Sequence, residues 1–307
     1  MLDQWLEELL AGYSDDQLLK AYQGLSHRYR QENYIPGFQS DGEVKAYAAA
    51  RMPATVAAIS QIFRELPADF SPTSILDLGA GTGAASLTAL TYFPNVTHFK
   101  LVEQDGRALA AARQLLEPLS KAGSYLRANL KEYVIDQPTD FVILSYVLNE
   151  LKGEEQSQVL ERVLLSQSRY VLIVMPGTPL CFKQLLGLRG LALASGYRIA
   201  APCSHHQTCP MAKDPWCHFK VRLPRTRLHR AFKKAALNFE DEKFCYLLLS
   251  KDPTEFPGLR IVKNPIHRSG HSIFDVCEPH HLKRFIIARK HKDLYKKISK
   301  REWGDIL

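Results

Sequence analysis

One stretch, Ile75–Gly83, constrains the fold of this chain more than any other. It reads Ile-Leu-Asp-Leu-Gly-Ala-Gly-Thr-Gly, so an apolar run ends in an acid and opens into glycines at every second position. An apolar segment, 84–90, follows. Glycine lets the backbone take positive φ and approach a ligand closely, and a helix that follows turns its free N–H groups toward that ligand. The stretch predicts a strand, a ligand-binding turn and a helix.

The next apolar segment, His98–Glu103, ends in an acid about twenty residues after the glycines, where nucleotide-binding α/β folds place a ribose-binding carboxylate. The glycine spacing is G-x-G-x-G, which differs from the dinucleotide fingerprint and lacks the Lys-Ser/Thr of a phosphate loop. It resembles motif I of the class I methyltransferases, which bind S-adenosylmethionine (SAM). Another doubly wound fold with a different ligand stays open as the alternative.

The resemblance extends to three further segments. Arg127–Leu130 fits the loop after a third strand, near the adenine; Phe141–Ser145 fits the fourth strand, and Tyr170–Gly177 the fifth. Strands that alternate with helical patterns predict a parallel sheet. The resemblance implies seven cofactor-binding residues: Asp77, Gly79, Gly81, Gly83, Glu103, Asn129 and Ser145.

The first 70 residues have helical periodicity, with apolar residues three and four apart over 2–10, 15–30 and 43–66. Pro53 is expected to kink or divide the third helix. We interpret this region as a helical cap over the sheet. The predicted division is an N-terminal helical region (1–70), a methyltransferase-like domain (71–252) and a basic C-terminal extension (253–307).

The charge of the chain is uneven. Residues 1–210 hold 18 basic and 21 acidic residues, whereas residues 211–307 hold 22 and 11, so the net charges are −3 and +11. The tail 289–301 is rich in lysine and arginine, and Tyr295 and Trp303 are aromatic residues that can stack on bases. This asymmetry predicts a surface that faces nucleic acid or the ribosome; a merely solvated basic face is the alternative.

Three of the six cysteines, Cys203, Cys209 and Cys217, stand among turn residues near 201–220, and Cys277 follows about sixty residues later. Four thiolates suit zinc or an iron–sulfur cluster. The C-x5-C-x7-C spacing is wider than the close pairs of common zinc modules and suits a loop around a larger cluster, with unrelated reduced thiols as the alternative. Cys181 and Cys245 lie in apolar segments and are predicted to be small buried hydrophobes.

The segments around these cysteines resemble one family. They are Pro202–Phe219, the Arg-Leu-His-Arg run 227–230, the Glu-Asp-Glu-Lys-Phe segment 240–244 and the Trp-Gly-Asp end 301–305. Together they resemble the methyltransferase-like assembly factors of the small ribosomal subunit, which are known from mitochondria and also found in bacteria. The similarity runs from about Glu43 to the end.

The resemblance implies a SAM-type fold, a 4Fe–4S cluster on Cys203, Cys209, Cys217 and Cys277, with zinc as the alternative, and contact with small-subunit rRNA during assembly. The predicted fold class is therefore α/β: a class I SAM-methyltransferase (Rossmann-like) sheet with an N-terminal helical region and a C-terminal metal-cluster and basic extension. No membrane or DNA partner is expected. The acidic first residues resemble neither a signal nor an Arg-rich transit peptide, so a bacterial cytoplasmic protein is predicted.

A catalytic group is hard to assign. An amino-group methyltransferase usually carries Asp/Asn-Pro-Pro-Tyr/Phe after the fourth strand, but residues 145–150 read Ser-Tyr-Val-Leu-Asn-Glu. Asn149 or Glu150 can orient an acceptor, or equally cap a helix. Two functions follow: an rRNA methyltransferase, or an assembly factor that binds SAM without transferring its methyl group. The missing motif favours the second.

Overall fold

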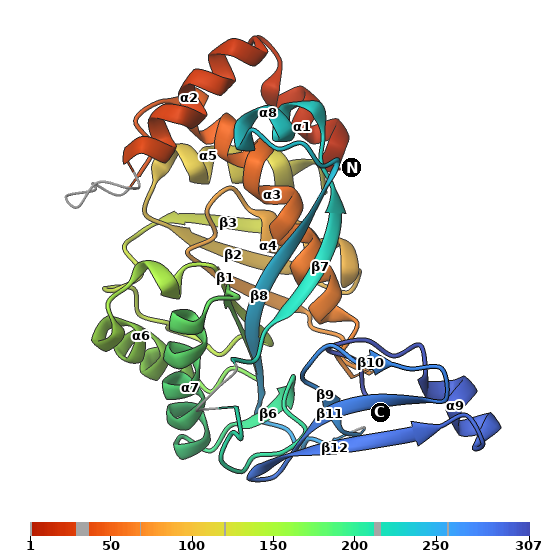
Figure 1. The fold of residues 1–307 in the computed structure, drawn as a ribbon. Coiled ribbons are helices and arrows are strands. Elements are labelled where there is room, and N and C mark those ends of the chain that lie inside the picture. Colours follow the sequence, from red (N-terminus) through yellow and green to blue (C-terminus); the bar gives the residue numbers. More distant parts are fainter. Residues whose placement is uncertain (1, 29–36, 68, 120, 212–215, 257) are drawn as a thin grey trace. The chain divides into compact units, whose positions relative to one another are not determined.

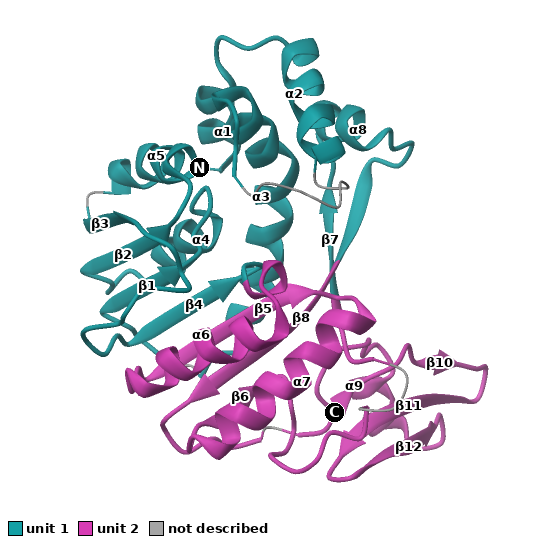
Figure 2. Cartoon of the chain, turned by 90° about the vertical axis from the view of Figure 1, so that its left-hand side faces the viewer, with its two compact units in different colours: residues 1–147, 220–242 teal, residues 148–219, 243–307 magenta. Residues whose placement is uncertain are grey.

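The computed structural model describes the whole chain except residues 1, 29–36, 68, 120, 212–215 and 257 (Figure 1). The described residues form two compact units (Figure 2). Unit 1 contains residues 1–147 and 220–242, and unit 2 contains residues 148–219 and 243–307. Each unit is therefore assembled from two separate stretches of the chain.

Unit 1 contains a parallel sheet in the order β3-β2-β1-β4 (Figure 1). The strands are β1 (Ser74–Leu78), β2 (His98–Glu103), β3 (Ala122–Arg127) and β4 (Phe141–Ser145). β1 lies in the centre, and every residue from Ile75 to Leu78 is buried because both faces of a parallel strand are covered. Parallel strands present their carboxyl ends at one edge, so the loops after all four strands meet there. The parallel sheet predicted for this region is confirmed.

The helices of unit 1 are α1 (Leu2–Leu10), α2 (Asp15–Arg28), α3 (Asp41–Phe63), α4 (Ala84–Tyr92), α5 (Gly106–Leu116) and α8 (Arg227–Lys233). Three of them follow the predicted helices 2–10, 15–30 and 43–66, although residues 29 and 30 lie outside the described part. α2 begins with a capping box: the Gln17 amide N–H donates to Ser14 Oγ at 3.2 Å, and the Ser14 amide N–H donates to Gln17 Oε1 at 2.8 Å.

The prediction that Pro53 divides the third helix is wrong, because α3 continues through it as one helix of 23 residues. Proline in a helix interior costs about 3 kcal/mol. Burial on both sides of Pro53 offsets this cost. Ala46 and Ala50 pack in a core with Leu18 and Phe232, and at the other end the ring of Phe63 lies 5.9 Å from that of Phe141 on β4. Tertiary packing thus outweighs the local preference.

Unit 2 contains the rest of the central strands: β5 (Tyr170–Pro176), β6 (Arg198–Ala201) and the second part of β8 (Phe239–Ser250). β8 lies between β5 and β6 and is antiparallel to both. β8 is twice as long as the apolar run 244–249 indicates, because it begins with Phe239 and three acidic residues, 240–242, which belong to unit 1. β8 also pairs with β7 (Phe219–Pro224). The helices of unit 2 are α6 (Gly153–Leu165), α7 (Pro179–Ala194) and α9 (Lys292–Ile298).

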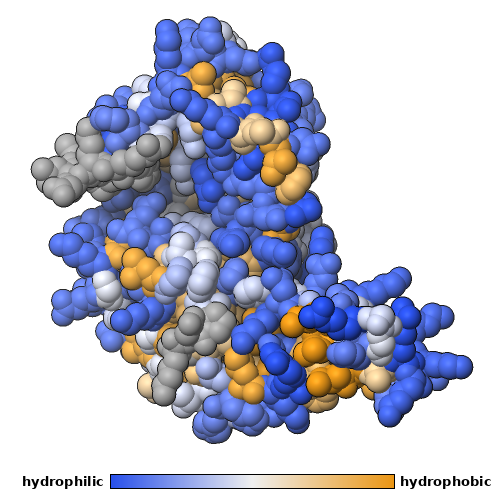
Figure 3. Space-filling view, in the orientation of Figure 1, coloured by the Kyte–Doolittle hydropathy of each residue, from blue (hydrophilic) through white to orange (hydrophobic). Residues whose placement is uncertain are grey.

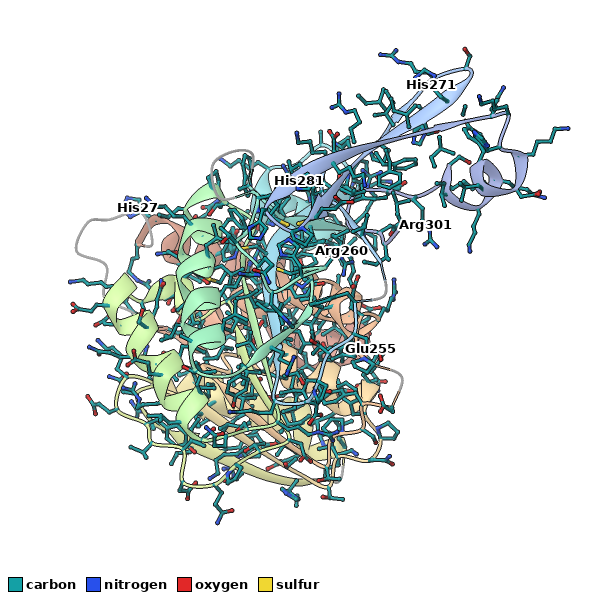
Figure 4. All side chains as sticks on the ribbon, turned by 90° about the horizontal axis from the view of Figure 1, so that it is seen from below. His27, Glu255, Arg260, His271, His281 and Arg301 are labelled. Atoms are coloured by element: carbon teal, nitrogen blue, oxygen red, sulfur yellow. The ribbon has the colours of Figure 1, made fainter. Side chains whose placement is uncertain are left out.

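A second, four-stranded sheet in unit 2 contains β9 (Arg260–Ile261), β10 (Ile266–His267), β11 (His271–Glu278) and β12 (His281–Ala288). Figure 4 labels His271 and His281 at opposite ends of the β11–β12 hairpin. One face of the sheet packs on Ile298 of α9 through Phe274, Val276 and Ile287, while the outer end of this region is mostly hydrophilic (Figure 3).

The last residues of the chain belong to this sheet's core. The Leu307 amide N–H donates to the Leu259 carbonyl at 2.9 Å, and the Gly304 amide N–H donates to the Ile261 carbonyl at 2.9 Å. The basic tail is therefore part of a folded layer. In the described ranges, no helix combines the length and the apolar composition that crossing a membrane requires.

Candidate cofactor pocket and cysteine cavity

The glycine-rich turn after β1 has the conformation that its sequence predicts. Gly79, Gly81 and Gly83 have φ values of 71°, 54° and 84°, which side chains strongly disfavour. A Cβ at Gly79 would lie 2.3 Å from the Val147 side chain, so no other residue fits there. Gly83 is the N-cap of α4 and makes no side-chain cap, which leaves the first N–H groups of the helix available to a ligand.

Glu103 at the end of β2 lies against this turn. Its Oε2 accepts a hydrogen bond from the Gly81 amide N–H at 2.8 Å, and its Oε1 accepts one from the Asp105 amide N–H at 2.8 Å. Burial raises the pKa of this carboxyl, although both backbone bonds oppose the shift. Each carboxylate oxygen keeps a further lone pair, so Glu103 can still accept bonds from two ligand hydroxyls.

Two polar atoms near the turn are buried and have no protein partner among the described residues. They are Oδ1 of Asp77 and Oγ of Ser145. Asp77 is fully buried, and its other oxygen accepts a hydrogen bond from Ser86 Oγ at 2.6 Å. Burial raises the pKa of Asp77 to about 7, and the nearby Glu103 carboxylate contributes to the shift. An orphaned buried oxygen is costly, so these atoms suit a polar ligand.

Asn129, the remaining predicted pocket residue, lies in the loop just after β3. Its Oδ1 accepts a hydrogen bond from the Lys131 amide N–H at 3.0 Å, so the side chain closes its own turn. β1, β2, β3 and β4 end at the same edge of the sheet. The structure therefore brings the seven predicted residues to that edge, and their roles as cofactor ligands stay predictions.

A network that the sequence did not reveal stands where β4 ends. Arg51 on α3 makes a two-pronged ion pair with Glu242 on β8, with N–O distances of 3.0 and 3.4 Å. The Tyr146 hydroxyl donates to the same carboxylate at 3.2 Å. Tyr146 has a φ of 56°, which is uncommon for a bulky residue and marks local strain. Arg51 and Glu242 are 191 residues apart in the chain, so no local sequence pattern predicts that they form an ion pair.

The Arg-Leu-His-Arg run has a structural position in unit 1. His229 on α8 is buried, and its Nε2 lies 3.2 Å from Oε2 of Glu240 on β8. Arg227 forms an ion pair with Asp15 on α2. Two of the segments that carry the family resemblance therefore build the junction of α2, α8 and β8.

The four cysteines of the predicted metal site line one cavity in unit 2. The cavity walls also contain Phe182 and Leu185 from α7, and two arginines, Arg189 and Arg260. Figure 4 labels Arg260 in this region. Most of the lining is apolar, and the thiols come from three separate places in the chain: the loop after β6, the residues just before β7, and β11. Residues 212–215 of the cysteine-rich segment lie outside the described part.

Burial favours the protonated form of three of these thiols, those of Cys209, Cys217 and Cys277, in the absence of a metal. It raises the pKa of Cys209, raises that of Cys217 well above its usual value, and raises that of Cys277 to about 12. Neighbouring thiols add to each shift, because a second thiolate in the same cavity is repelled. A metal would reverse this preference, since its positive charge stabilises several thiolates together.

Among the described residues, no group of three histidine, cysteine or carboxylate side chains is arranged to hold a metal ion. The other two cysteines, Cys181 and Cys245, are 7% and 1% exposed, which confirms that they are small buried hydrophobes.

A parallel sheet with a glycine turn after its first strand and an acid after its second defines the class of Rossmann-like, methyltransferase-like α/β proteins. Residues 41–307 match the family model described as mitochondrial small ribosomal subunit Rsm22. The chain belongs to this family, and the predicted resemblance to methyltransferase-like proteins of small-subunit assembly is confirmed.

Curated relatives agree. The chain is 24% identical over 321 residues to the human protein "Ribosome assembly protein METTL17, mitochondrial", a match that covers 94% of this chain and 67% of that protein. It is 22% identical to the fission yeast "Rsm22-cox11 tandem protein 2, mitochondrial", over 87% of this chain and 43% of the relative. The chain therefore spans less than half of the fission yeast protein.

Solved structures are more distant. The N-methyltransferase NodS from Bradyrhizobium japonicum, in complex with S-adenosyl-l-homocysteine, has a TM-score of 0.47 at 10% identity, over 76% of this chain and 99% of that one. The magnesium protoporphyrin IX methyltransferase ChlM from Synechocystis has a TM-score of 0.44 at 13% identity, over 78% and 100%. Similarity this low does not transfer a ligand, a substrate or a reaction to this chain.

The predicted bacterial cytoplasmic location is wrong. The matching family is described as mitochondrial, and the human and fission yeast relatives are mitochondrial proteins by name. The prediction relied on the acidic composition of the first residues, and that composition does not report the compartment of this family.

Proposed function

We propose that this protein binds SAM at the Gly79–Gly83 turn and acts on the small ribosomal subunit and its rRNA during assembly, without needing to transfer the methyl group. The observation that carries the proposal is the network of Tyr146, Glu242 and Arg51. In methyltransferases the loop after the fourth strand receives the acceptor. Here Tyr146, the first residue after β4, donates a hydrogen bond to the buried carboxylate of Glu242, and Arg51 neutralises the charge of that carboxylate.

The pocket chemistry supports SAM as the ligand. SAM carries a cationic sulfonium, an amino group and two ribose hydroxyls. Asp77 and Glu103 offer acceptors, and their carboxylates complement positive charge. The N-terminus of α4 and the glycine amides supply donors at the same turn.

An active rRNA methyltransferase is the second candidate. Ser145 supports it, because its buried hydroxyl lacks a protein partner among the described residues at the end of β4 and can orient an acceptor. Transfer of a labelled methyl group from SAM to small-subunit rRNA separates the two functions. We expect SAM binding without transfer; transfer at a useful rate that disappears in Glu103→Ala contradicts the non-catalytic function.

We also propose that Cys203, Cys209, Cys217 and Cys277 hold one 4Fe–4S cluster, with zinc as the alternative. When bound, the cluster supplies a covalent cross-link between distant segments and a site for one electron. The support for a shared metal site is that all four cysteines line one cavity. Iron, acid-labile sulfide and zinc analysis after anaerobic purification tests it. One zinc and no sulfide contradicts the cluster, and full metal content in Cys277→Ser contradicts the ligand set.

The rRNA contact is assigned to the C-terminal region of unit 2. Its support is the excess of basic residues in 243–307, which hold 14 lysines and arginines against 7 acids, and the exposure of the three lysines of α9. Lysine contacts to phosphate give affinity with little sequence preference. The register of this surface on the rRNA would therefore depend on the shape of the folded RNA rather than on base reading.

A further inference from the structure

The wall of the cysteine cavity contains buried arginine side chains, whose positive charge a metal site of four thiols does not by itself require. Arg189 on α7 is 6% exposed and lines the cavity. Its Nη2 donates to the His205 and Gln207 carbonyls at 3.0 and 2.9 Å. Both carbonyls lie in the loop between Cys203 and Cys209. Arg189 therefore fixes the loop that carries two of the proposed ligands.

The Nε of Arg189 is buried without a hydrogen-bond partner among the described residues. No carboxylate among the described residues pairs with the Arg189 guanidinium. The described cavity lining includes no aspartate or glutamate. A buried charge without a counter-charge is strongly unfavourable. The described lining offers no aspartate or glutamate to Arg189, so an anionic occupant of the cavity would balance its charge.

Two further groups face the same space. His205 is 5% exposed; its Nε2 lies 3.3 Å from Cys277 Sγ, and its Nδ1 has no partner among the described residues. Arg260 on β9 donates from Nε to the Pro202 carbonyl at 2.9 Å, just before Cys203. Its Nη1 donates to the Gly304 carbonyl at 2.6 Å. Two guanidinium groups and one imidazole therefore lie around the thiols.

We propose that the guanidinium groups of Arg189 and Arg260, together with the His205 imidazole beside Cys277, form a shell that stabilises the reduced state of the iron–sulfur cluster. The cluster is then a site that accepts one electron from a low-potential redox protein, as well as a cross-link. The inference rests on the proposed 4Fe–4S site. A cluster on four thiolates is anionic and gains one more negative charge when it accepts an electron. Nearby positive charge and hydrogen bonds to the sulfurs favour that step and raise the reduction potential. No bond forms or breaks in it.

The shell makes these three residues positioning residues. Arg189 and Arg260 act through the loop and the field, and His205 acts through the Cys277 sulfur. A merely structural role for Arg189 would affect folding or cluster content but would leave the potential of the bound cluster unchanged. The potential therefore separates the two roles.

The experiment uses the full chain, purified anaerobically, and titrates the cluster with dithionite while its electron paramagnetic resonance signal is followed. Arg189→Gln should lower the reduction equilibrium constant at least tenfold, which is about 59 mV for one electron. Arg189→Lys keeps the charge and should keep most of the potential. Arg198→Gln is the matched control, since Arg198 is an exposed arginine on β6 in the same unit.

His205 provides a second measurement if Arg189→Gln fails to fold. His205→Leu removes the donor to Cys277 and should also lower the potential, while His205→Gln keeps an N–H donor and should restore it. Equal potentials in wild type, Arg189→Gln and His205→Leu, at full iron and sulfide content, overturn the shell and leave the cluster. A wild type without iron and sulfide overturns both proposals.

Discussion

Glu103 is the residue on which the proposed SAM site depends most directly. Both of its carboxylate oxygens already accept backbone N–H groups, so the side chain is held in one place before a ligand arrives. Glu103→Ala should weaken SAM binding by at least one to two orders of magnitude, because it removes two charge-assisted hydrogen bonds and each of them contributes about 1.5–3 kcal/mol. Isothermal calorimetry measures the change. Glu132→Ala removes an exposed acid of unit 1 and should leave the affinity unchanged.

Asp77 gives the molecule a pH dependence of known sign. Its pKa is raised to about 7 in the folded state, mainly by burial, from the ordinary value of 3.8. Between about pH 4 and pH 7 the folded state holds a proton that the unfolded state has released. The free energy of unfolding therefore falls as the pH rises through this window, by up to about 1.4 kcal/mol per pH unit. Asp77→Asn should lack this slope in urea unfolding. Parallel profiles for the two proteins would contradict the shift.

Much of the candidate cofactor pocket could be predicted from short stretches of sequence. Gly79, Gly81 and Gly83 specify a turn by their own backbone freedom, and Glu103 follows from the length of one βα unit. The pair Arg51–Glu242 did not follow, because its partners lie on elements far apart in the chain. The roles proposed for Arg189 and His205 could not be predicted from the sequence for a related reason. These roles depend on the lack of a carboxylate in the described cavity wall, and only the fold shows which residues form that wall.

At the scale of elements, α9 carries the clearest test of RNA binding. Removing the tail from Arg289 onward would also remove Ile298 and Gly304, which belong to the core and backbone pairing of the C-terminal sheet. Charge removal is the cleaner change. Lys296→Gln with Lys297→Gln should weaken binding to small-subunit rRNA. The slope of log affinity against log salt should fall by up to about 0.9 for each phosphate that is no longer neutralised.

The control for that experiment is Lys20→Gln with Lys131→Gln, which removes the same charge from exposed positions of unit 1. Filter binding across a salt series measures both slopes. An equal decrease in the two double variants would mean that binding responds to net charge alone, and the α9 surface would then have no special role.

Elements also show where sequence patterns mislead. The periodicity of α3 predicts its extent correctly, but the effect expected of Pro53 is wrong, since packing on two sides of the helix offsets a local cost. β8 extends beyond its apolar run because Phe239–Glu242 are held by charged partners such as Arg51 and Arg225. The division of the chain into 1–70, 71–252 and 253–307 stays a prediction.

For the whole molecule, the two units should respond differently to removal of the metal. The proposed ligands all lie in unit 2, whereas the glycine turn lies in unit 1. Cys277→Ser should increase amide hydrogen exchange in β9, β11 and β12, because it removes binding energy that closes a long loop. Protection in β1, β2 and β4 should stay the same, as should SAM affinity. Reduced protection throughout both units would contradict this independence.

The segment 220–242 has a consequence for how the protein is made. It completes unit 1, yet the ribosome must first synthesise residues 148–219 of unit 2. At about 5–20 residues per second, the nascent first unit waits on the order of ten seconds for its missing piece. During that time Leu18, Ala46 and Ala50 lack the ring of Phe232 that packs against them in the finished unit. A nascent chain stalled before residue 220 would therefore present an unfinished apolar surface, a natural target for chaperones.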